Sequence, residues 1–290
     1  MEDISKSARR NLILITGVFS ASTACLFSRW ANCPAVVLAF YRMLLSAAPM
    51  VPYMLILGRH ELFRVRRREI MLCLASGVFL GLHFACYFGA INHTSVAAAQ
   101  TLTSLEVFFV AILSYALFKE RISRVGWIGI LIVFGGSLLI TFGDIRKGGA
   151  LSGDLIAVCA GLTMASYTLI GRRNRQCMST ASYTFFVYAA ATVTLTLLVP
   201  IGGYRFSGYG SVNWLCALAM AVLCTLGGHT VFSWSLKYFP ATHVSTIKLL
   251  APLFSTMLSG FFFKEIPTPV TLLGCVVLIC GTVLYIRSGN

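Results

Sequence analysis

Residues 105–120, LEVFFVAILSYALFKE, form an apolar run that ends in a charged Lys-Glu turn. The stretch 251–265, APLFSTMLSGFFFKE, has the same character, and its Lys-Glu pair follows the first by 145 residues. The same offset relates the glycines after each turn, Gly129 and Gly136 in the first case and Gly274 and Gly281 in the second. A constant offset over several features indicates that the chain is a tandem duplication of a unit about half its length.

The composition places the chain in a membrane. Of its 290 residues, 58% are apolar and 11% are charged, and the mean hydropathy is +0.83, so too few polar residues exist to cover a soluble globule. The ten cysteines lie mostly inside apolar runs and form no CxxC pair, so we interpret them as small core residues and expect neither a metal nor a cofactor.

The apolar runs predict an all-α polytopic membrane protein with about ten transmembrane helices, because one span needs ~20 mostly apolar residues. The first run follows basic residues as a secretory signal does, but Arg29 ends it like a helix flank, and we expect it to stay uncleaved. The predicted spans are Asn11–Phe27, Ala35–Leu57, Ile70–Ile91, Val96–Phe118, Val125–Phe142, Leu155–Gly171, Ala181–Ile201, Val212–Leu236, Ala241–Phe263 and Thr268–Ile286.

The distribution of positive charge predicts the orientation. With the N-terminus inside, sixteen of the 23 Lys and Arg residues fall in inner segments and five in outer segments, while Arg42 and Lys248 lie within spans. Because cytoplasmic loops retain Lys and Arg, we expect both termini to be cytoplasmic, in the plasma (inner) membrane. The formal charge of +14 therefore indicates contact with the lipid bilayer and not with a nucleic acid.

The duplication divides the chain into a first repeat, residues 1–147, and a second, residues 148–290. Five spans is an odd number, so the second repeat should be inverted relative to the first. Two inverted five-helix repeats are an arrangement found in secondary transporters, whose substrate site lies near the bilayer midplane between the repeats.

Several further motifs lie in a characteristic order: His93-Thr94-Ser95-Val96-Ala97 before Leu105-Glu106, Phe118-Lys119-Glu120-Arg121-Ile122-Ser123, Gly153-Asp154-Leu155, Gly228-His229-Thr230, Leu236-Lys237-Tyr238-Phe239-Pro240-Ala241-Thr242, and Lys264-Glu265. In this order and duplication the whole chain resembles the ten-helix permeases of the drug/metabolite transporter superfamily with paired EamA-like domains. The resemblance implies export or exchange of small metabolites such as amino acids, through a cavity lined by the first, third, fourth, sixth, eighth and ninth helices. Family members often carry Glu-Pro in the fourth and ninth helices, where this chain has Glu106-Val107 and Ala251-Pro252.

Glu106 and Lys248 are charged residues inside predicted spans, where a charge needs a partner or a water-filled cavity. Counting ~1.5 Å per residue from the predicted helix ends places both about 12 Å from the inner edge of the hydrocarbon core. The two can therefore share one plane. Two interpretations stay open: a structural ion pair that locks the repeats together, or two groups that hold opposite ends of a zwitterionic substrate.

Histidines and aromatic residues supply the other candidates. Residues one turn apart share a helix face, as His83 and Tyr87 do, and as His229 and Ser233 do; for each histidine, a hydrogen-bonded core role is the alternative. Tyr167 and Trp234 are candidates for stacking on a substrate, with aromatic packing as the alternative. The candidate substrate-binding residues are Glu106, Lys248, His83, Tyr87, Tyr167, His229 and Trp234.

Other intramembrane features are interpreted as structural. We expect Arg42 to snorkel or to pair in the bundle, because the second helix is peripheral in the family that the chain resembles. The spaced glycines predict helix-packing faces, with a homodimer contact along the fifth and tenth helices as an extension. Pro252 is the candidate for a gating bend.

The sequence as a whole favours a secondary carrier that moves a small polar or amphipathic metabolite by alternating access. No P-loop is present, and no polar segment is long enough for a nucleotide-binding domain. The alternatives from other classes are an intramembrane lipid-modifying enzyme, and a channel or non-transporting membrane sensor. An enzyme would need clustered carboxylates or a catalytic dyad, and Glu106 is the sole acidic residue within the predicted spans.

Overall fold

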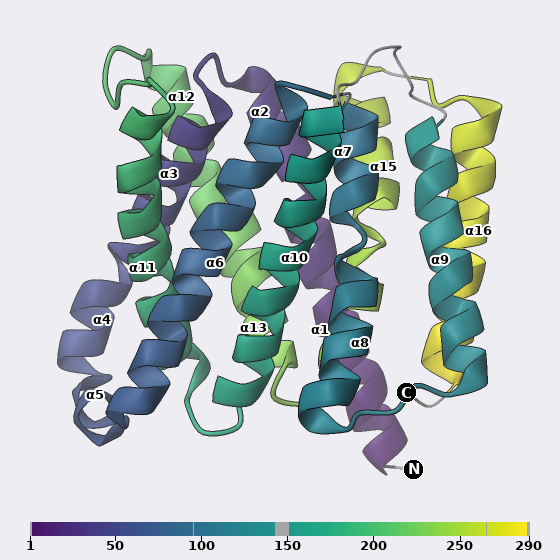
Figure 1. Ribbon diagram of the computed structural model, residues 1–290, viewed down its shortest axis with the longest axis horizontal. Helices are drawn as coiled ribbons and strands as arrows, with labels where there is room; N and C mark the ends of the chain where they lie inside the picture. The colour runs from purple at the N-terminus through teal and green to yellow at the C-terminus, as the bar shows by residue number, and fades with distance from the viewer. Residues whose placement is uncertain (1, 95, 143–150, 265, 289–290) are drawn as a thin grey trace.

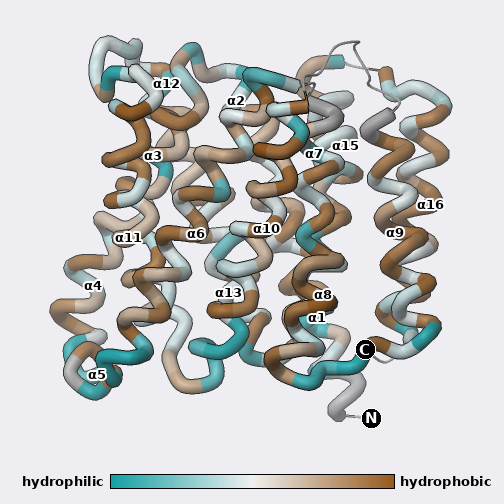
Figure 2. The backbone as a smooth tube through the Cα atoms, viewed as in Figure 1, coloured by the Kyte–Doolittle hydropathy of each residue, from teal (hydrophilic) through white to brown (hydrophobic). Residues whose placement is uncertain are grey.

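The computed structural model describes residues 2–94, 96–142, 151–264 and 266–288, and every regular element within them is a helix. The helices run side by side along one direction (Figure 1). Apolar residues follow their middles, and polar residues gather at their ends (Figure 2). Within the described residues, nine helices are long and apolar enough to cross a membrane, and Arg124–Ile140 is a shorter apolar helix. The predicted all-α polytopic membrane fold is confirmed.

Among the described residues, nine helical elements belong to the first repeat and eight to the second. The first-repeat elements are α1 (Glu2–Ser22), α2 (Ala24–Trp30), α3 (Ala35–Ala47), α4 (Met50–Ile56), α5 (Arg59–Arg64), α6 (Arg67–Ile91), α7 (Val96–Thr103), α8 (Glu106–Phe118) and α9 (Arg124–Phe142). The second-repeat elements are α10 (Leu151–Asn174), α11 (Thr180–Ile201), α12 (Ser211–Ala219), η1 (Met220–His229), α13 (Thr230–Ser235), α14 (Ala241–Lys248), α15 (Ala251–Phe263) and α16 (Pro269–Arg287).

The helix boundaries repeat with the offset of the sequence. Helices α14, α15 and α16 begin and end 145 residues after α7, α8 and α9. Lys119 and Lys264, which end α8 and α15, have φ values of 59° and 55°, and among the described residues they alone combine a positive φ with a side chain. The left-handed position after a helix usually holds glycine. Both repeats therefore end their fourth span with the same uncommon turn.

The two repeats have opposite orientations in the bundle. Helix α1 begins and α16 ends at one face of the molecule, where α8 also ends, whereas α15 ends at the other face (Figure 1). We call the first the terminal face; it carries the connection 57–66, which includes α5, and the connections 119–123, 175–179 and 236–240, and we refer to all four as its loops. The opposite face carries the loops 31–34, 92–94, 202–210 and 266–268. The second repeat is therefore inverted, as predicted.

Glycines bring α9 and α16 into close antiparallel contact. A methyl group at Gly136 would lie 2.6 Å from the backbone nitrogen of Leu278, and one at Gly281 would lie 2.7 Å from that of Val133. These two contacts are equivalent under the repeat symmetry. The predicted packing faces are confirmed as a contact within the chain, which we call the glycine seam. A homodimer stays a prediction and would have to use other faces of these helices.

Some sequence predictions fall outside the described residues. The repeat boundary between residues 147 and 148 lies in the segment 143–150, together with Arg146 and Lys147 of the charge count. Ser95 and Glu265 of the quoted motifs lie outside as well.

The glycine seam allows a matched mutational test. Gly136→Ala and Gly281→Ala each force a side chain into backbone atoms, and we expect each to lower the free energy of unfolding by about 1–3 kcal/mol, as overpacking does. A methyl group at Gly135 would meet no atom within 4 Å, so Gly135→Ala should leave stability unchanged or raise it. Unfolding in mixed micelles measures all three. Equal effects at positions 135 and 136 would contradict the seam.

Candidate functional site

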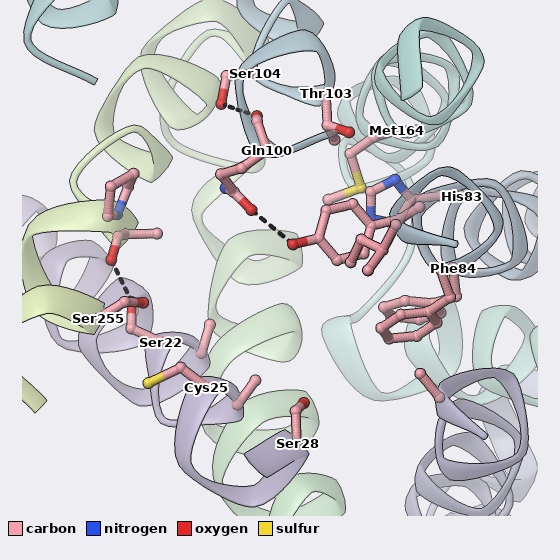
Figure 3. Close-up of a pocket in the computed structure, with 18 of the residues that line it drawn as sticks. Ser22, Cys25, Ser28, His83, Phe84, Gln100, Thr103, Ser104, Met164 and Ser255 are labelled. Carbon is pink, nitrogen blue, oxygen red and sulfur yellow. Dashed lines mark hydrogen bonds between the residues drawn. The ribbon is translucent and has the colours of Figure 1, made fainter. Parts of the chain in front are cut away.

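A cavity of 1720 Å³ lies between the two repeats. Its mouth is lined by loop residues of the opposite face, among them Pro34, Asn92 and Tyr204. Within the described residues, none of the four terminal-face loops contributes to its lining. Figure 3 shows Ser22, Cys25, Ser28 and Ser255 on one side of the cavity, and His83, Phe84 and Met164 on the other. The cavity therefore has a polar wall of small side chains and an aromatic wall, and it opens to one face.

The structure brings Glu106 and Lys248 together at this cavity. Lys248 Nζ lies 2.7 Å from Glu106 Oε1, and the two side chains are 12% and 11% exposed. The same carboxylate oxygen accepts hydrogen bonds from the hydroxyls of Thr168 and Ser245, each at 3.1 Å. One carboxylate oxygen thus joins α8 of the first repeat to α10 and α14 of the second.

Interrupted helices position this ion pair. The fourth span breaks between α7 and α8 at residues 104–105, and the ninth breaks between α14 and α15 at 249–250. Glu106 is the first residue of α8, and Lys248 is the last of α14. A helix start favours a negative charge and a helix end favours a positive one. Each member of the pair therefore sits where its own half-helix stabilises it.

The proline predicted to bend the ninth span is not needed for its interruption. Pro252 is the second residue of α15 and lines the cavity. Its counterpart in the first repeat is Val107, where the same interruption occurs without a proline. The predicted bend in the ninth span is present, and the matching interruption in the fourth span was not predicted.

His83 and Tyr87 line the cavity from α6, as expected of two residues on one face. Their rings stack at 6.3 Å between centroids. His83 Nδ1 lies 3.0 Å from the carbonyl oxygen of Ala160, and the Tyr87 hydroxyl donates to Gln100 Oε1 at 2.8 Å. Both side chains are thus held in place at the aromatic wall, where a bound molecule would touch them.

The second group of aromatic candidates is divided by the structure. His229 lines the cavity from η1, and Tyr167 stands behind it with ring centroids 6.3 Å apart. Tyr167 is 2% exposed, bonds Ser233 through its hydroxyl at 3.1 Å and does not line the cavity. Trp234 packs on Tyr238 at 4.8 Å and does not line the cavity either. Glu106, Lys248, His83, Tyr87 and His229 are therefore the candidates that the structure brings together.

Arg42 is a cavity residue that the sequence analysis assigned to the scaffold. It lines the cavity from α3 and is 5% exposed. Its Nε donates to Thr225 Oγ1 at 2.7 Å, across two spans that lie far apart in the sequence. An arginine near the middle of an apolar span was the available signal, and the peripheral place of that helix in the resembled family outweighed it.

Polar contacts close the terminal face below the cavity. Arg172 forms an ion pair with Glu120 at 3.0 Å and donates to the carbonyl oxygen of Leu236 at 2.9 Å. Arg175 donates to the carbonyl oxygen of Ser233 at 3.0 Å. These contacts tie the end of α10 to the turn after α8 and to α13, so we call them the closing contacts.

A further contact at this face involves Glu61 of α5. Its carboxylate accepts hydrogen bonds from the hydroxyls of Ser179 and Ser182. These two bonds hold the pKa of Glu61 below its ordinary value. The loop between the second and third spans is thereby fastened to the start of α11 whenever Glu61 is ionised.

The counterparts of the closing segments lie around the cavity mouth. The end of α2 corresponds to the end of α10, and its residues Ser28 and Arg29 line the cavity. The end of α6 corresponds to the end of α13, and its Ile91 lines the cavity as well. The ends of α10 and α13 thus meet at the terminal face, whereas their counterparts, the ends of α2 and α6, border the mouth of the cavity at the opposite face.

Removing one member of the buried ion pair tests its contribution to stability. Lys248→Met leaves the Glu106 carboxylate without its counter-ion. Removing one partner of a fully buried pair typically costs about 3–5 kcal/mol of folding free energy. We expect a smaller loss here, because both side chains line the cavity and are partly exposed. The double variant Glu106→Gln/Lys248→Met should recover most of that loss. Thermal melting of the purified variants measures both effects. A double variant that is no more stable than Lys248→Met would contradict this account.

Comparison with known proteins agrees with this architecture. A family model described as the EamA-like transporter family matches residues 9–142 and again residues 151–287. A crystal structure with 18% sequence identity superposes with a TM-score of 0.80 over 97% of this chain and 99% of that one, which shows a shared fold.

Curated relatives extend the comparison. The "Uncharacterized transporter YxxF" of Bacillus subtilis (strain 168) is 26% identical over 271 residues, which cover 91% of this chain and 86% of the relative. An "Uncharacterized transporter" of Archaeoglobus fulgidus is 24% identical over 254 residues, which cover 85% and 86%. Because the family model matches both halves of a chain folded as two inverted repeats, this multi-pass membrane protein belongs to the EamA-like transporter family.

Proposed function

We propose that this protein is a secondary active transporter that exports or exchanges small metabolites, such as amino acids or drug-like compounds, by alternating access. The observation that carries the proposal is the one-sided cavity between two inverted repeats. Segments related by the repeat close the terminal face through the closing contacts and border the mouth at the opposite face. Exchange of these two arrangements would move the opening to the terminal face.

The charge distribution supports an orientation for this proposal. The basic residues predicted to be cytoplasmic include Arg64, Arg121 and Arg173, which lie at or next to the terminal-face loops. With that face in the cytoplasm of the plasma (inner) membrane, both termini are cytoplasmic and the cavity opens outward. The structure would then represent the outward-open form of the transporter.

The Glu106–Lys248 pair has a direct role in this mechanism. It links the first repeat to the second at the cavity. A substrate that carries a charged group competes for one member of the pair, and the loss of that link loosens the contact between α8 and α14. Substrate binding and rearrangement of the repeats would be coupled in this way.

The fit of the alternatives is weaker. The relatives carry the word transporter in their names, which points away from an enzyme. Among the described residues, no group of three or more His, Cys, Asp or Glu side chains could hold a metal ion. A channel would need a path through the molecule, whereas the described cavity ends above the closing contacts.

Transport by purified protein in liposomes tests the proposal. A thermal-shift screen of amino acids, nucleosides, cationic dyes and quaternary amines first identifies a ligand, because a ligand of the folded state raises the melting temperature. Liposomes are then loaded with that ligand, and uptake of its labelled form is measured. A carrier should show saturable uptake that internal ligand accelerates, and Glu106→Gln and Lys248→Ala should each reduce it.

A matched control and the contrary results complete the test. Arg173→Gln removes an exposed cation at the terminal face, away from the cavity, and should retain exchange. Flux that neither saturates nor responds to internal ligand would indicate a channel. A chemically altered ligand would indicate an enzyme, and binding without flux would indicate a sensor.

A further inference from the structure

Arg42 is a buried cation in the cavity wall that the transport mechanism above does not use. Its side chain is oriented by two contacts, the hydrogen bond from Nε to Thr225 and the placement of Cζ 5.0 Å from the ring centroid of Phe84. A hydroxyl and an aromatic face orient a guanidinium group, but neither neutralises its charge. A charge in this position is stabilised by a counter-ion or by water in the cavity, and a counter-ion stabilises it more strongly than water does.

No carboxylate of the described residues serves as that counter-ion. Arg172 pairs with Glu120 and Lys248 pairs with Glu106, and Arg42 is in neither of these ion pairs. Glu106 is the one acidic residue among those that line the cavity, and its Oε1 already accepts three hydrogen bonds. The positive charge of Arg42 is therefore left for a molecule that enters the cavity.

The guanidinium group has donors available for such a molecule. Beyond the bond from Nε, Arg42 makes no hydrogen bond to any described residue, and its terminal nitrogens are not among the atoms sealed from solvent. A guanidinium group presents paired N–H donors in a planar fork that matches the two oxygens of a carboxylate.

His229 provides a second and independent indication of a ligand. Its side chain is 7% exposed and lines the cavity, yet its Nδ1 is buried without a hydrogen-bond partner among the described residues. Buried polar groups are nearly always hydrogen-bonded, so an unpartnered Nδ1 on a residue that lines a cavity indicates a missing hydrogen-bond partner. The ring lies 5.9 Å from that of Phe84, the same ring that Arg42 covers.

Both residues depend on η1, a π-helical segment. Thr225, the hydroxyl partner of Arg42, and His229 lie four residues apart within it. Isolated π-helical turns are frequent at functional sites. Here the segment holds Arg42, through Thr225, and His229 beside the ring of Phe84.

We propose that Arg42 and His229 form an anion subsite for the carboxylate of an amphipathic organic acid, whose apolar part packs on Phe84, Phe88 and Met164. These three side chains line the same wall of the cavity. The inference rests on the proposed transport function and narrows its substrates to compounds that carry a carboxylate. A substrate with an additional ammonium group would have to displace Lys248 from Glu106.

Three compounds with one apolar body test the subsite: 3-phenylpropanoate, its neutral amide 3-phenylpropanamide and the cation 2-phenylethylamine. Hexanoate and acetate, each with its amide, extend the comparison to carboxylates with other apolar groups. Binding to the full-length protein is measured by thermal shift and by calorimetry. We expect carboxylates to bind more tightly than the matched amides, and the amine to bind weakest.

Variants locate the carboxylate. Arg42→Gln should raise the Kd for the best carboxylate roughly 30-fold or more, as loss of one partner of a buried charge pair does. Arg42→Lys keeps the positive charge but lacks the paired N–H donors of a guanidinium group, so it should raise the Kd less than Arg42→Gln does. Arg173→Gln, which removes an exposed cation outside the cavity, should leave the Kd unchanged.

Several results would overturn the subsite: carboxylates and amides that bind equally, no carboxylate that binds at all, or a Kd unaffected by Arg42→Gln. If Arg42→Gln does not fold, the comparison of carboxylate with amide in the wild type still decides. Tighter binding of the amine together with ligand-accelerated exchange would contradict the anion subsite and support the proposed carrier function. Carboxylate binding without exchange would contradict the proposed carrier function and support the anion subsite.

Discussion

The ion pair between Glu106 and Lys248 is the interaction on which this architecture depends. Two opposite charges inside an apolar bundle are tolerated because they meet at 2.7 Å, each at the end of an interrupted helix that favours its sign. The pair also spans the repeats, since α8 belongs to the first and α14 to the second. Glu106 and Lys248 thus neutralise each other's charge and at the same time connect the two repeats at the cavity.

Around this pair, the repeats differ in packing although their helices begin and end at equivalent residues. The glycine seam between α9 and α16 obeys the symmetry, because its contacts map onto one another. The two faces of the bundle do not. The closing contacts unite α10, α13 and the turn after α8, while the segments equivalent to these in the other repeat border the cavity mouth. A duplicated chain with two such arrangements available is the structural basis of alternating access.

The sequence was most informative where a feature depends on composition or on a fixed period. Hydropathy predicted the spans, the offset of 145 predicted the repeat, and the odd number of spans in each repeat predicted its inversion. A count of helical rise brought Glu106 and Lys248 to one plane, and the structure pairs them.

Features that depend on tertiary packing could not be predicted. The interruptions at 104–105 and 249–250 carry no shared proline, and the widening of η1 has no evident residue signal. That π-helical segment ends five residues before Trp234. A regular helical period therefore could not predict the direction of the Trp234 side chain. Arg42 was assigned to the scaffold because its helix is peripheral in the resembled family, and its partner Thr225, 183 positions away, could not be foreseen.

The most direct test of the account is a pair of distances measured by double electron–electron resonance in one lipid environment. One labelled pair, at Arg121 and Arg173, spans the closed terminal face, and the other, at Asn92 and Ile266, spans the cavity mouth, each in a background without the exposed cysteines Cys159, Cys177 and Cys280. The account predicts two populations at each face, with the terminal-face distance lengthening in the conditions that shorten the mouth distance. A terminal-face distance that stays fixed while the mouth opens and closes would contradict alternating access.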